Sequence, residues 1–248
     1  MYTLVSDIDG TIYKNKTIAK KDIRSMKIFS KNNELILATG RNYVTFSKLK
    51  NSFDLSYKYC ILCNGAIIIN SKKNIINKLT FKSSILKLLY TDLIKSNMSV
   101  GLSISFLMEG LYYPDIRKIN IDTIIKKIPN DISGICIELT NNESNDNDIF
   151  LLIKNRIGNL GIEKNGKYID ISPVNVTKAT AVKYLINNKL ISEHVVVLGD
   201  SNNDISLFEE YDNSFVIKEA NMQIKKYANF EVACISECIE ILEKKNEE

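Results

Sequence analysis

The feature that most constrains this chain is an apolar stretch near its start that runs directly into two acidic residues. In the segment Leu4–Thr11, a short apolar strand is followed by Asp7 and Asp9, and Gly10 allows a sharp turn after the second acid. An unpaired charge inside a buried strand is very costly, so we expect both acids just past the strand's carboxyl end. In an open α/β sheet, ligands bind at that edge. Two carboxylates there indicate either a Mg²⁺ site or a nucleophile paired with an acid/base.

Length and charge limit the classes of protein that this chain can belong to. Its 248 residues are enough for one large domain or a core with a smaller second domain. The net charge of +4 is mild and fits a small anionic substrate better than an extended nucleic-acid surface. There is no run of about 18 apolar residues, so no membrane span is expected. An acid at Asp7 interrupts the N-terminus before a signal peptide's apolar region could form, so we expect no such peptide.

The cysteines indicate a reducing environment. Five is an odd number in a chain too large to need disulfides, which predicts a cytoplasmic protein. Cys60 and Cys63 have the spacing of a redox pair, but such a pair normally opens a helix, and these two lie in or just after an apolar strand. We therefore interpret them as buried, inert thiols. Cys234 and Cys238 are four apart on a predicted helix and should face the core.

Apolar stretches alternate with segments of helical length at both ends of the chain. This alternation predicts βαβ units and a parallel sheet covered by helices, a three-layer Rossmann-like α/β fold. In the first third, the predicted strands are Tyr2–Ser6, Leu35–Ala38 and Tyr59–Leu62, and the predicted helices are Asn42–Lys50 and Ile18–Ser30, the latter burying Ile23, Met26, Ile28 and Phe29. Near the C-terminus, the predicted strands are His194–Leu198 and Phe215–Ile217, and the predicted helices are Thr177–Asn187, Asp204–Glu210, Met222–Tyr227 and Ile235–Lys245.

The middle third has a different pattern, with hairpins and single helices. Asn165-Gly166 is a strong hairpin signal, and Glu109-Gly110 is interpreted as a second turn. The segment Ile119–Ile128 is predicted helical, whereas the polar segment Asn141–Asn147 is predicted to be a loop. We interpret this region as an inserted α+β domain, residues 81–173, within a discontinuous core formed by residues 1–80 and 174–248.

Four polar clusters follow or begin apolar elements in the two outer thirds. They are Asp7-x-Asp9-Gly10-Thr11, Thr39-Gly40-Arg41, Lys178 and the run Gly199–Asp204. Because parallel strands all end at one edge of a sheet, at least three of these clusters should converge there. Carboxylates suit Mg²⁺, and an ammonium with a hydroxyl suits a phosphoryl group, whose transfer needs positioning and charge neutralisation.

Together, these clusters resemble the four motifs of the haloacid dehalogenase (HAD) superfamily, in the same order. The chain is most similar to the Cof-type and sucrose-phosphatase-like branch of sugar-phosphate phosphatases, because the insertion matches the position of that branch's α/β cap (type IIB, C2B). Asn64-Gly65-Ala66 also resembles a segment frequent in that branch. Either acidic motif alone would be suggestive, and both at this separation are highly specific.

The resemblance implies a role for each matched residue. Asp7 would be the nucleophile that forms an aspartyl-phosphate, and Asp9 the acid that protonates the leaving alkoxide and then activates water. The family's phosphate-binding positions correspond to Thr39, Gly40, Lys178 and Asn203. Mg²⁺ would be bound by Asp7, Asp9 (through its backbone carbonyl), Asp200 and Asp204. The implied activity is Mg²⁺-dependent hydrolysis of a small sugar phosphate or related phosphorylated metabolite, by a monomer or homodimer.

Other interpretations stay open at this point. The Asp7-x-Asp9 pair could belong to a glycosyltransferase that binds a nucleotide sugar, although this leaves Lys178 and the Gly199–Asp204 run unexplained. A phosphosugar mutase would share the aspartyl-phosphate, and a non-catalytic sugar-phosphate-binding protein would share the pocket without needing Asp9. Taken singly, every cluster also has a structural explanation as turn, helix-cap or surface residues.

Three further residue types receive structural rather than catalytic interpretations. Arg41 is expected to pair with an acid rather than with the substrate. His194, the single histidine, is expected to be structural. Tyr112 and Tyr113 are expected to pack in the core or on a half-exposed strand face rather than to stack on a sugar ring.

Overall fold

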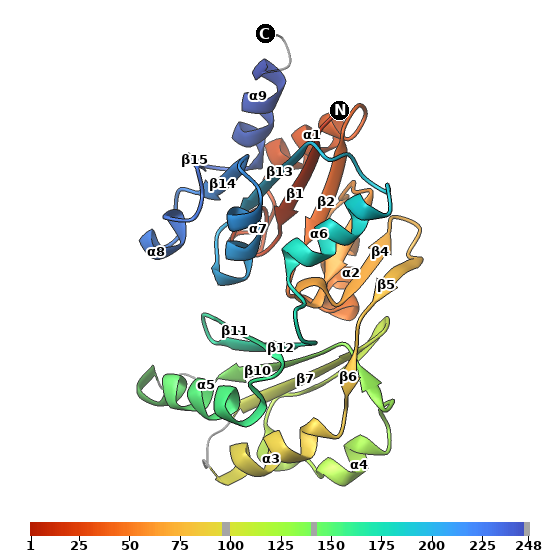
Figure 1. The fold of residues 1–248 in the computed structure, drawn as a ribbon, viewed down its shortest axis with the longest axis vertical. Helices are drawn as coiled ribbons and strands as arrows, with labels where there is room; N and C mark the ends of the chain where they lie inside the picture. Colours follow the sequence, from red (N-terminus) through yellow and green to blue (C-terminus); the bar gives the residue numbers. More distant parts are fainter. Residues whose placement is uncertain (96–99, 140–142, 246–248) are drawn as a thin grey trace.

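The computed structural model describes residues 1–95, 100–139 and 143–245, which form two units of unequal size, each with helices and a main sheet (Figure 1). The larger unit is built on an eight-stranded sheet, the large sheet, with the strand order β15-β14-β13-β1-β2-β3-β4-β5. The six strands from β15 to β3 are parallel, and β4 and β5 add an antiparallel edge. The strands are β1 (Thr3–Asp7), β2 (Glu34–Ala38), β3 (Tyr59–Leu62), β4 (Ile67–Asn70), β5 (Ile75–Lys78), β13 (Val195–Gly199), β14 (Ser214–Ile217) and β15 (Phe230–Val232).

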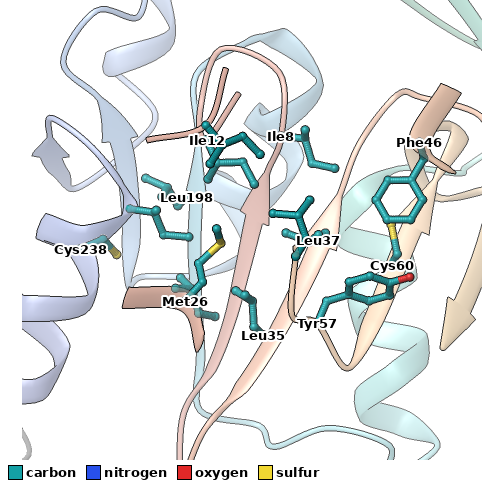
Figure 2. Close-up of a cluster of buried hydrophobic side chains, with 14 of the residues drawn as sticks. Ile8, Ile12, Met26, Leu35, Leu37, Phe46, Tyr57, Cys60, Leu198 and Cys238 are labelled. Carbon is teal, nitrogen blue, oxygen red and sulfur yellow. The ribbon is translucent and has the colours of Figure 1, made fainter. Parts of the chain in front are cut away.

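Helices cover both faces of the large sheet, which confirms the predicted three layers. The parallel strands β1, β2, β3, β13 and β14 are buried throughout, as parallel strands in such folds are, and successive residues contribute to opposite apolar clusters. On one face, Leu35, Leu37 and Leu198 pack against Met26, Phe46 and Cys238 of the covering helices (Figure 2). These helices are α1 (Lys20–Phe29), α2 (Tyr43–Ser52) and α9 (Ile235–Lys245), and the other face is covered by α6 (Lys178–Asn187), α7 (Ile205–Glu210) and α8 (Met222–Lys225).

The second unit is α+β; it is called the inserted unit and lies between β5 and α6 in sequence. It faces the end of the large unit where α2 and α6 begin (Figure 1). Its sheet is antiparallel, with the order β11-β12-β10-β7-β8, and a short pair formed by β6 and β9 accompanies it. Its elements are β6 (Phe81–Lys82), α3 (Ile85–Lys95), β7 (Val100–Phe106), β8 (Glu109–Tyr113), α4 (Ile121–Ile125), β9 (Asp131–Ile132), β10 (Gly134–Leu139), α5 (Glu143–Ile157), β11 (Gly161–Asn165) and β12 (Tyr168–Ser172).

The two faces of the inserted sheet differ in chemistry. Strand register aligns one apolar row across all five strands, which packs against the helices: Ile162, Ile171, Ile135, Ile104 and Leu111. The next register row points to the opposite face and is polar: Glu163, Asp170, Cys136, Ser103 and Tyr112. The inserted sheet therefore presents polar side chains toward the carboxyl edge of the large sheet.

Several element boundaries differ from the sequence prediction. Helix α5 begins at Glu143, inside the segment predicted as a loop, whose first two residues lie outside the described ranges. Its apolar residues, Ile149, Ile153 and Ile157, are buried, and this packing overrides the weak helix preference of the polar residues before them. Ile28, predicted on the buried face of α1, is instead exposed.

The remaining corrections concern short elements. The turn predicted at Glu109-Gly110 lies at residues 107–108, where Leu107 has a positive φ of 51°, so both predicted turn residues belong to β8. Helix α4 covers only Ile121–Ile125, and a separate 3₁₀ turn, Ile116–Lys118, precedes it. The short strands β6, β9 and β15 were not predicted, because two or three residues are too few to show a strand period.

Candidate active site

A buried ammonium group connects two of the acids that the sequence places far apart. The Lys178 Nζ atom donates to Asp7 Oδ1 at 2.6 Å and to Asp204 Oδ1 at 2.7 Å. Lys178 is completely buried, and Asp7 is 3% exposed. Asp7 is the last residue of β1 rather than the first residue beyond it, which corrects the expected position by one or two residues. The buried ion pair with Lys178 offsets the cost of a charge in the strand.

Local capping fixes the position of Lys178. Thr177 is the N-cap of α6 and forms a reciprocal capping box with Thr180, so Lys178 is the first helical residue. Gly65 has a φ of +119°, and any side chain there would overlap the Thr177 backbone. The loop after β3 can therefore pass directly beside the start of α6 only because residue 65 is glycine.

The run after β13 forms a tight turn around the Asp204 carboxylate. Asp204 Oδ2 accepts hydrogen bonds from the backbone amides of Asp200 (3.0 Å) and Ser201 (3.1 Å). A side chain at Gly199 would overlap the Asp204 carboxylate, so glycine is required there. The Thr11 hydroxyl donates to Asp200 Oδ1 at 2.7 Å, which links the first acidic motif to the last.

Three carboxylates gather at this edge. Asp7, Asp200 and Asp204 each offer an oxygen within 4.8 Å of the others. Burial raises the pKa of the Asp7 carboxyl well above its ordinary value, although the Lys178 ammonium opposes this rise. Burial and the neighbouring Asp204 raise the pKa of Asp200 to about 6. Burial alone would lower the pKa of Lys178, but Asp204 and Asp7 raise it above its usual range.

This donor set fits a divalent cation. Three carboxylates and one ammonium leave an excess of negative charge in a buried site, which is unfavourable without a counterion. Asp7 Oδ2 is buried and has no hydrogen-bond partner among the described residues, so one ligand oxygen is free. Hard oxygen donors of this type suit Mg²⁺ or a similar ion. Enzymes of the HAD superfamily use a divalent metal, and Asp7, Asp200 and Asp204 are the residues here that could bind one.

Asp9 has a different environment from these three acids. Arg41 donates from Nε to Asp9 Oδ2 at 2.7 Å and from Nη2 to Asp9 Oδ1 at 2.6 Å, a bidentate pair. The expectation that Arg41 pairs with an acid is therefore confirmed. The Asp9 side chain is 46% exposed and lies outside the three-carboxylate group, so any contribution to a metal would come from its backbone carbonyl.

A chain of hydrogen bonds connects the large sheet with the inserted unit. Asn203 Nδ2 donates to Asn64 Oδ1 at 3.0 Å, and Asn64 Nδ2 donates to Asp170 Oδ2 at 3.2 Å. Asn64 is buried. Its backbone has a positive φ of 54°, a conformation that asparagine tolerates better than most residues. Asn64 follows an apolar strand, which is the same signal that identified the other clusters. The sequence analysis did not identify Asp170.

A pocket of about 370 Å³ lies between the large sheet and the inserted sheet. Its large-unit wall contains the predicted residues Asp7, Asp9, Thr39, Gly40 and Asn203. The inserted unit supplies the opposite wall, and its residues were not predicted from the sequence: Ser103, Ser105, Tyr112, Cys136, Glu138, Asn165, Tyr168 and Asp170. Tyr112 is 59% exposed, so its strand face is exposed as expected, but it lines this pocket and therefore does not have the purely structural position that the sequence analysis gave it.

Comparison with known proteins identifies the family. Residues 4–237 match the haloacid dehalogenase-like hydrolases. The chain belongs to this family. An uncharacterized protein of Mycoplasma capricolum subsp. capricolum is 29% identical to this HAD-family hydrolase, over 92% of this chain and 95% of the relative.

Solved structures show the same fold. A haloacid dehalogenase-like hydrolase from B. subtilis has a TM-score of 0.79 at 14% identity, covering 97% of this chain and 99% of its own. A HAD subclass IIB sugar phosphatase has a TM-score of 0.78 at 18% identity, with 99% of both chains covered. The predicted architecture, a HAD-type parallel-sheet core with an inserted α+β unit, is therefore confirmed.

His194 and the Cys60–Cys63 pair are not among the residues that line the pocket. His194 is exposed just before β13, and its backbone carbonyl accepts a hydrogen bond from Thr3. Cys60 and Cys63 are buried, and burial raises the pKa of the Cys63 thiol to about 12, which agrees with an inert thiol. Within the described ranges, each helix is too short or too polar to cross a bilayer.

Proposed function

We propose that this protein is a Mg²⁺-dependent phosphomonoester hydrolase that acts on a small sugar phosphate or related metabolite through an aspartyl-phosphate. The observation that carries this proposal is the buried Asp7 carboxylate, which is held by Lys178 among three converging acids and lines the pocket. A carboxylate attacks an anionic phosphate only where the charges are neutralised, and this site concentrates the groups for that task. Membership of a hydrolase family and the fold of a sugar phosphatase support the same conclusion.

In the first step, an oxygen of Asp7 attacks phosphorus, and the bond from phosphorus to the ester oxygen breaks. Asp9 gives its proton to the leaving oxygen, which departs as an alcohol. In the second step, Asp9 takes a proton from water and the water oxygen attacks phosphorus. The bond between phosphorus and the Asp7 oxygen breaks, which releases inorganic phosphate and regenerates the Asp7 carboxylate. Each Asp9 oxygen accepts one hydrogen bond from Arg41, so a transferred proton would use a lone pair that this pairing leaves free.

We assign the other predicted residues to binding. Asp7, Asp200 and Asp204, with the Asp9 backbone carbonyl, would hold Mg²⁺. When bound, Mg²⁺ neutralises negative charge on the phosphoryl oxygens and the carboxylates. The phosphoryl group would be held by Thr39, Gly40, Lys178 and Asn203, which lie on or below the pocket floor.

We also propose a division of labour between the two units. Residues 1–80 and 174–248 would form the catalytic core, and residues 81–173 would form a cap that excludes bulk water and contacts the leaving group. The hydrogen bonds of Asn64 with Asp170 and of Asn165 with Ser201 already join the two units across the pocket. The partner is then a small phosphorylated metabolite, and the five free thiols agree with a cytoplasmic location.

The decisive experiment measures release of inorganic phosphate from a panel of sugar phosphates and small phosphorylated acids, with Mg²⁺ and with EDTA. We expect turnover that requires Mg²⁺, and none in the Asp7→Asn variant. Asp9→Asn should lose turnover by about 10²–10⁴-fold while Mg²⁺ still stabilises the protein against heat. Full activity of Asp9→Asn would reject its acid/base role. Thermal stabilisation by nucleotide sugars but not by phosphomonoesters would favour a glycosyltransferase instead.

A further inference from the structure

The wall that the inserted unit contributes to the pocket is rich in hydrogen-bond acceptors and lacks cationic side chains. Of the lining residues from this unit, two are carboxylates, Glu138 and Asp170, and neither a lysine nor an arginine is among them. The wall also contains the hydroxyl groups of Ser103, Ser105 and Tyr112. Within the part of the chain that the structure describes, the wall is therefore negative on balance.

The two carboxylates on this wall have different partners. Glu138 accepts from Lys167 Nζ at 2.6 Å and from the Tyr112 hydroxyl at 2.9 Å, so a cation already neutralises it. Asp170 accepts instead from the Asn64 amide at 3.2 Å and from the Cys136 thiol, which are uncharged donors. Burial raises the pKa of the Asp170 carboxyl, and these donors oppose that rise.

Asp170 also lies next to the predicted phosphate-binding turn. A Cβ atom built on Gly40 would be 3.1 Å from Asp170 Oδ2 and 3.1 Å from Asn64 Oδ1. The carboxylate therefore lies against the same turn that would hold the phosphoryl group. Because Asp170 also lines the pocket, a leaving group that fills the pocket would come within reach of this carboxylate.

We propose that Asp170 determines specificity, by selecting phosphomonoesters whose leaving group donates hydroxyl hydrogen bonds and by rejecting those that carry a second anion. This inference rests on the proposed phosphatase function and concerns the leaving group of the same reaction. A carboxylate without a cationic hydrogen-bond partner accepts well from a hydroxyl and repels a second carboxylate, and such like-charge repulsion is a common source of specificity. The neighbouring Ser103, Ser105 and Tyr112 hydroxyls suit the same kind of leaving group.

The test compares two substrates that differ in one group. Glycerol 3-phosphate ends in a hydroxymethyl group, and 3-phosphoglycerate has a carboxylate in its place. We expect the wild-type protein with Mg²⁺ to prefer glycerol 3-phosphate by about 30-fold in kcat/KM. The Asp170→Asn variant should reduce this preference by about tenfold, chiefly through a gain on 3-phosphoglycerate. Asp170→Ser, which also lacks the charge, provides a second variant if the first folds poorly.

Cys136→Ser is the matched control. It changes the pocket wall beside Asp170 but keeps the charge and a hydrogen-bond donor, so the preference should stay within about twofold of the wild type. A purely structural role for Asp170 would lower kcat/KM for both substrates by the same factor, and that result would overturn the proposal. Equal use of the two substrates by the wild type would overturn it as well.

A generic ester separates this proposal from the function on which it rests. Hydrolysis of p-nitrophenyl phosphate without discrimination between the two matched substrates would reject the role of Asp170 and leave the phosphatase intact. If no ester releases phosphate in the presence of Mg²⁺, the proposed function fails, and the specificity proposal fails with it.

Discussion

The two walls of the pocket are built in opposite ways. On the large-unit wall, Asp7 is almost completely buried, and the ammonium of the buried Lys178 joins it to Asp204 of a separate motif. On the inserted-unit wall, Tyr112 and Tyr168 are largely exposed, and Glu138 pairs with the exposed Lys167. Under the proposed function, bond breaking would use charges fixed by burial, whereas leaving-group selection would also use side chains that remain in contact with water.

Removing the central cation should have the largest effect. We expect Lys178→Met to lower the free energy of unfolding by about 3–5 kcal/mol in EDTA, because two buried carboxylates lose their counterion. Phosphatase turnover should fall by at least about 10²-fold. Urea unfolding measures the first effect, and Mg²⁺ should restore part of the lost stability by replacing the missing charge.

The control for this variant comes from the opposite wall. Lys167 also pairs with a carboxylate, Glu138, at 2.6 Å, but half of its side chain is exposed. Lys167→Met should therefore cost no more than about 1 kcal/mol. If the two lysine variants lost equal stability, burial would not be what distinguishes the walls.

Two glycines with positive φ, one in each unit, allow the large unit and the inserted unit to be compared through the backbone. Gly10 has a φ of 84°, and a side chain there would overlap the Asp200 carboxylate, whereas Gly166 has a φ of 55° and open space around it. Gly10→Ala should destabilise the protein by about 2–3 kcal/mol and weaken stabilisation by Mg²⁺, because both strain and displacement of Asp200 contribute. Gly166→Ala should cost about 1 kcal/mol from strain alone. Thermal unfolding with and without Mg²⁺ measures both, and a larger loss in Gly166→Ala would contradict the assignment.

The three clustered acids Asp7, Asp200 and Asp204 should make the free energy of unfolding depend on pH. The pKa of Asp200 is about 6 in the folded protein, above the value of roughly 4 for an unfolded chain, because of burial and the neighbouring Asp204. Between these two pKa values the folded state binds more protons than the unfolded state. The free energy of unfolding therefore falls as pH rises from about 4 through about 6, and levels off above that.

In EDTA, we expect the free energy of unfolding to decrease by about 1–3 kcal/mol between pH 5 and pH 7.5. Saturating Mg²⁺ should flatten or reverse this trend, because a bound cation favours the ionised acids. Asp200→Asn should reduce the slope in EDTA. Stability that rises with pH over this range in EDTA would show that the acids ionise more easily than their burial implies.

The sequence predicted one wall far better than the other. Asp7, Lys178 and Asp204 were identified because charged residues at the ends of apolar elements stand out, and parallel strands bring their carboxyl ends together. Pairing of Arg41 with an acid was predicted, but Asp9 was not identified as that acid, because the bidentate pair depends on the conformation of two loops.

The inserted-unit wall could not be predicted, because its residues alternate with apolar ones along antiparallel strands. Asp170 and Glu138 look like solvent-facing positions of half-buried strands, and only the register across five strands aligns them toward the pocket. The turn before β8 was also misplaced. Glycine is the usual residue at a positive φ, but here Leu107 rather than Gly110 has it.

The smallest expected effect concerns a single hydroxyl group on the inserted-unit wall. Tyr112→Phe removes the hydrogen bond from the tyrosine hydroxyl to Glu138 Oε2, 2.9 Å long, at an exposed site where water can replace it. Glu138 keeps its ion pair with Lys167, so the charge of the wall does not change. We expect kcat/KM for p-nitrophenyl phosphate and glycerol 3-phosphate to change by less than about threefold. A loss of about 10²-fold or more would mean that this wall contributes directly to the chemistry, and the contrast between a catalytic wall and a selecting wall would no longer hold.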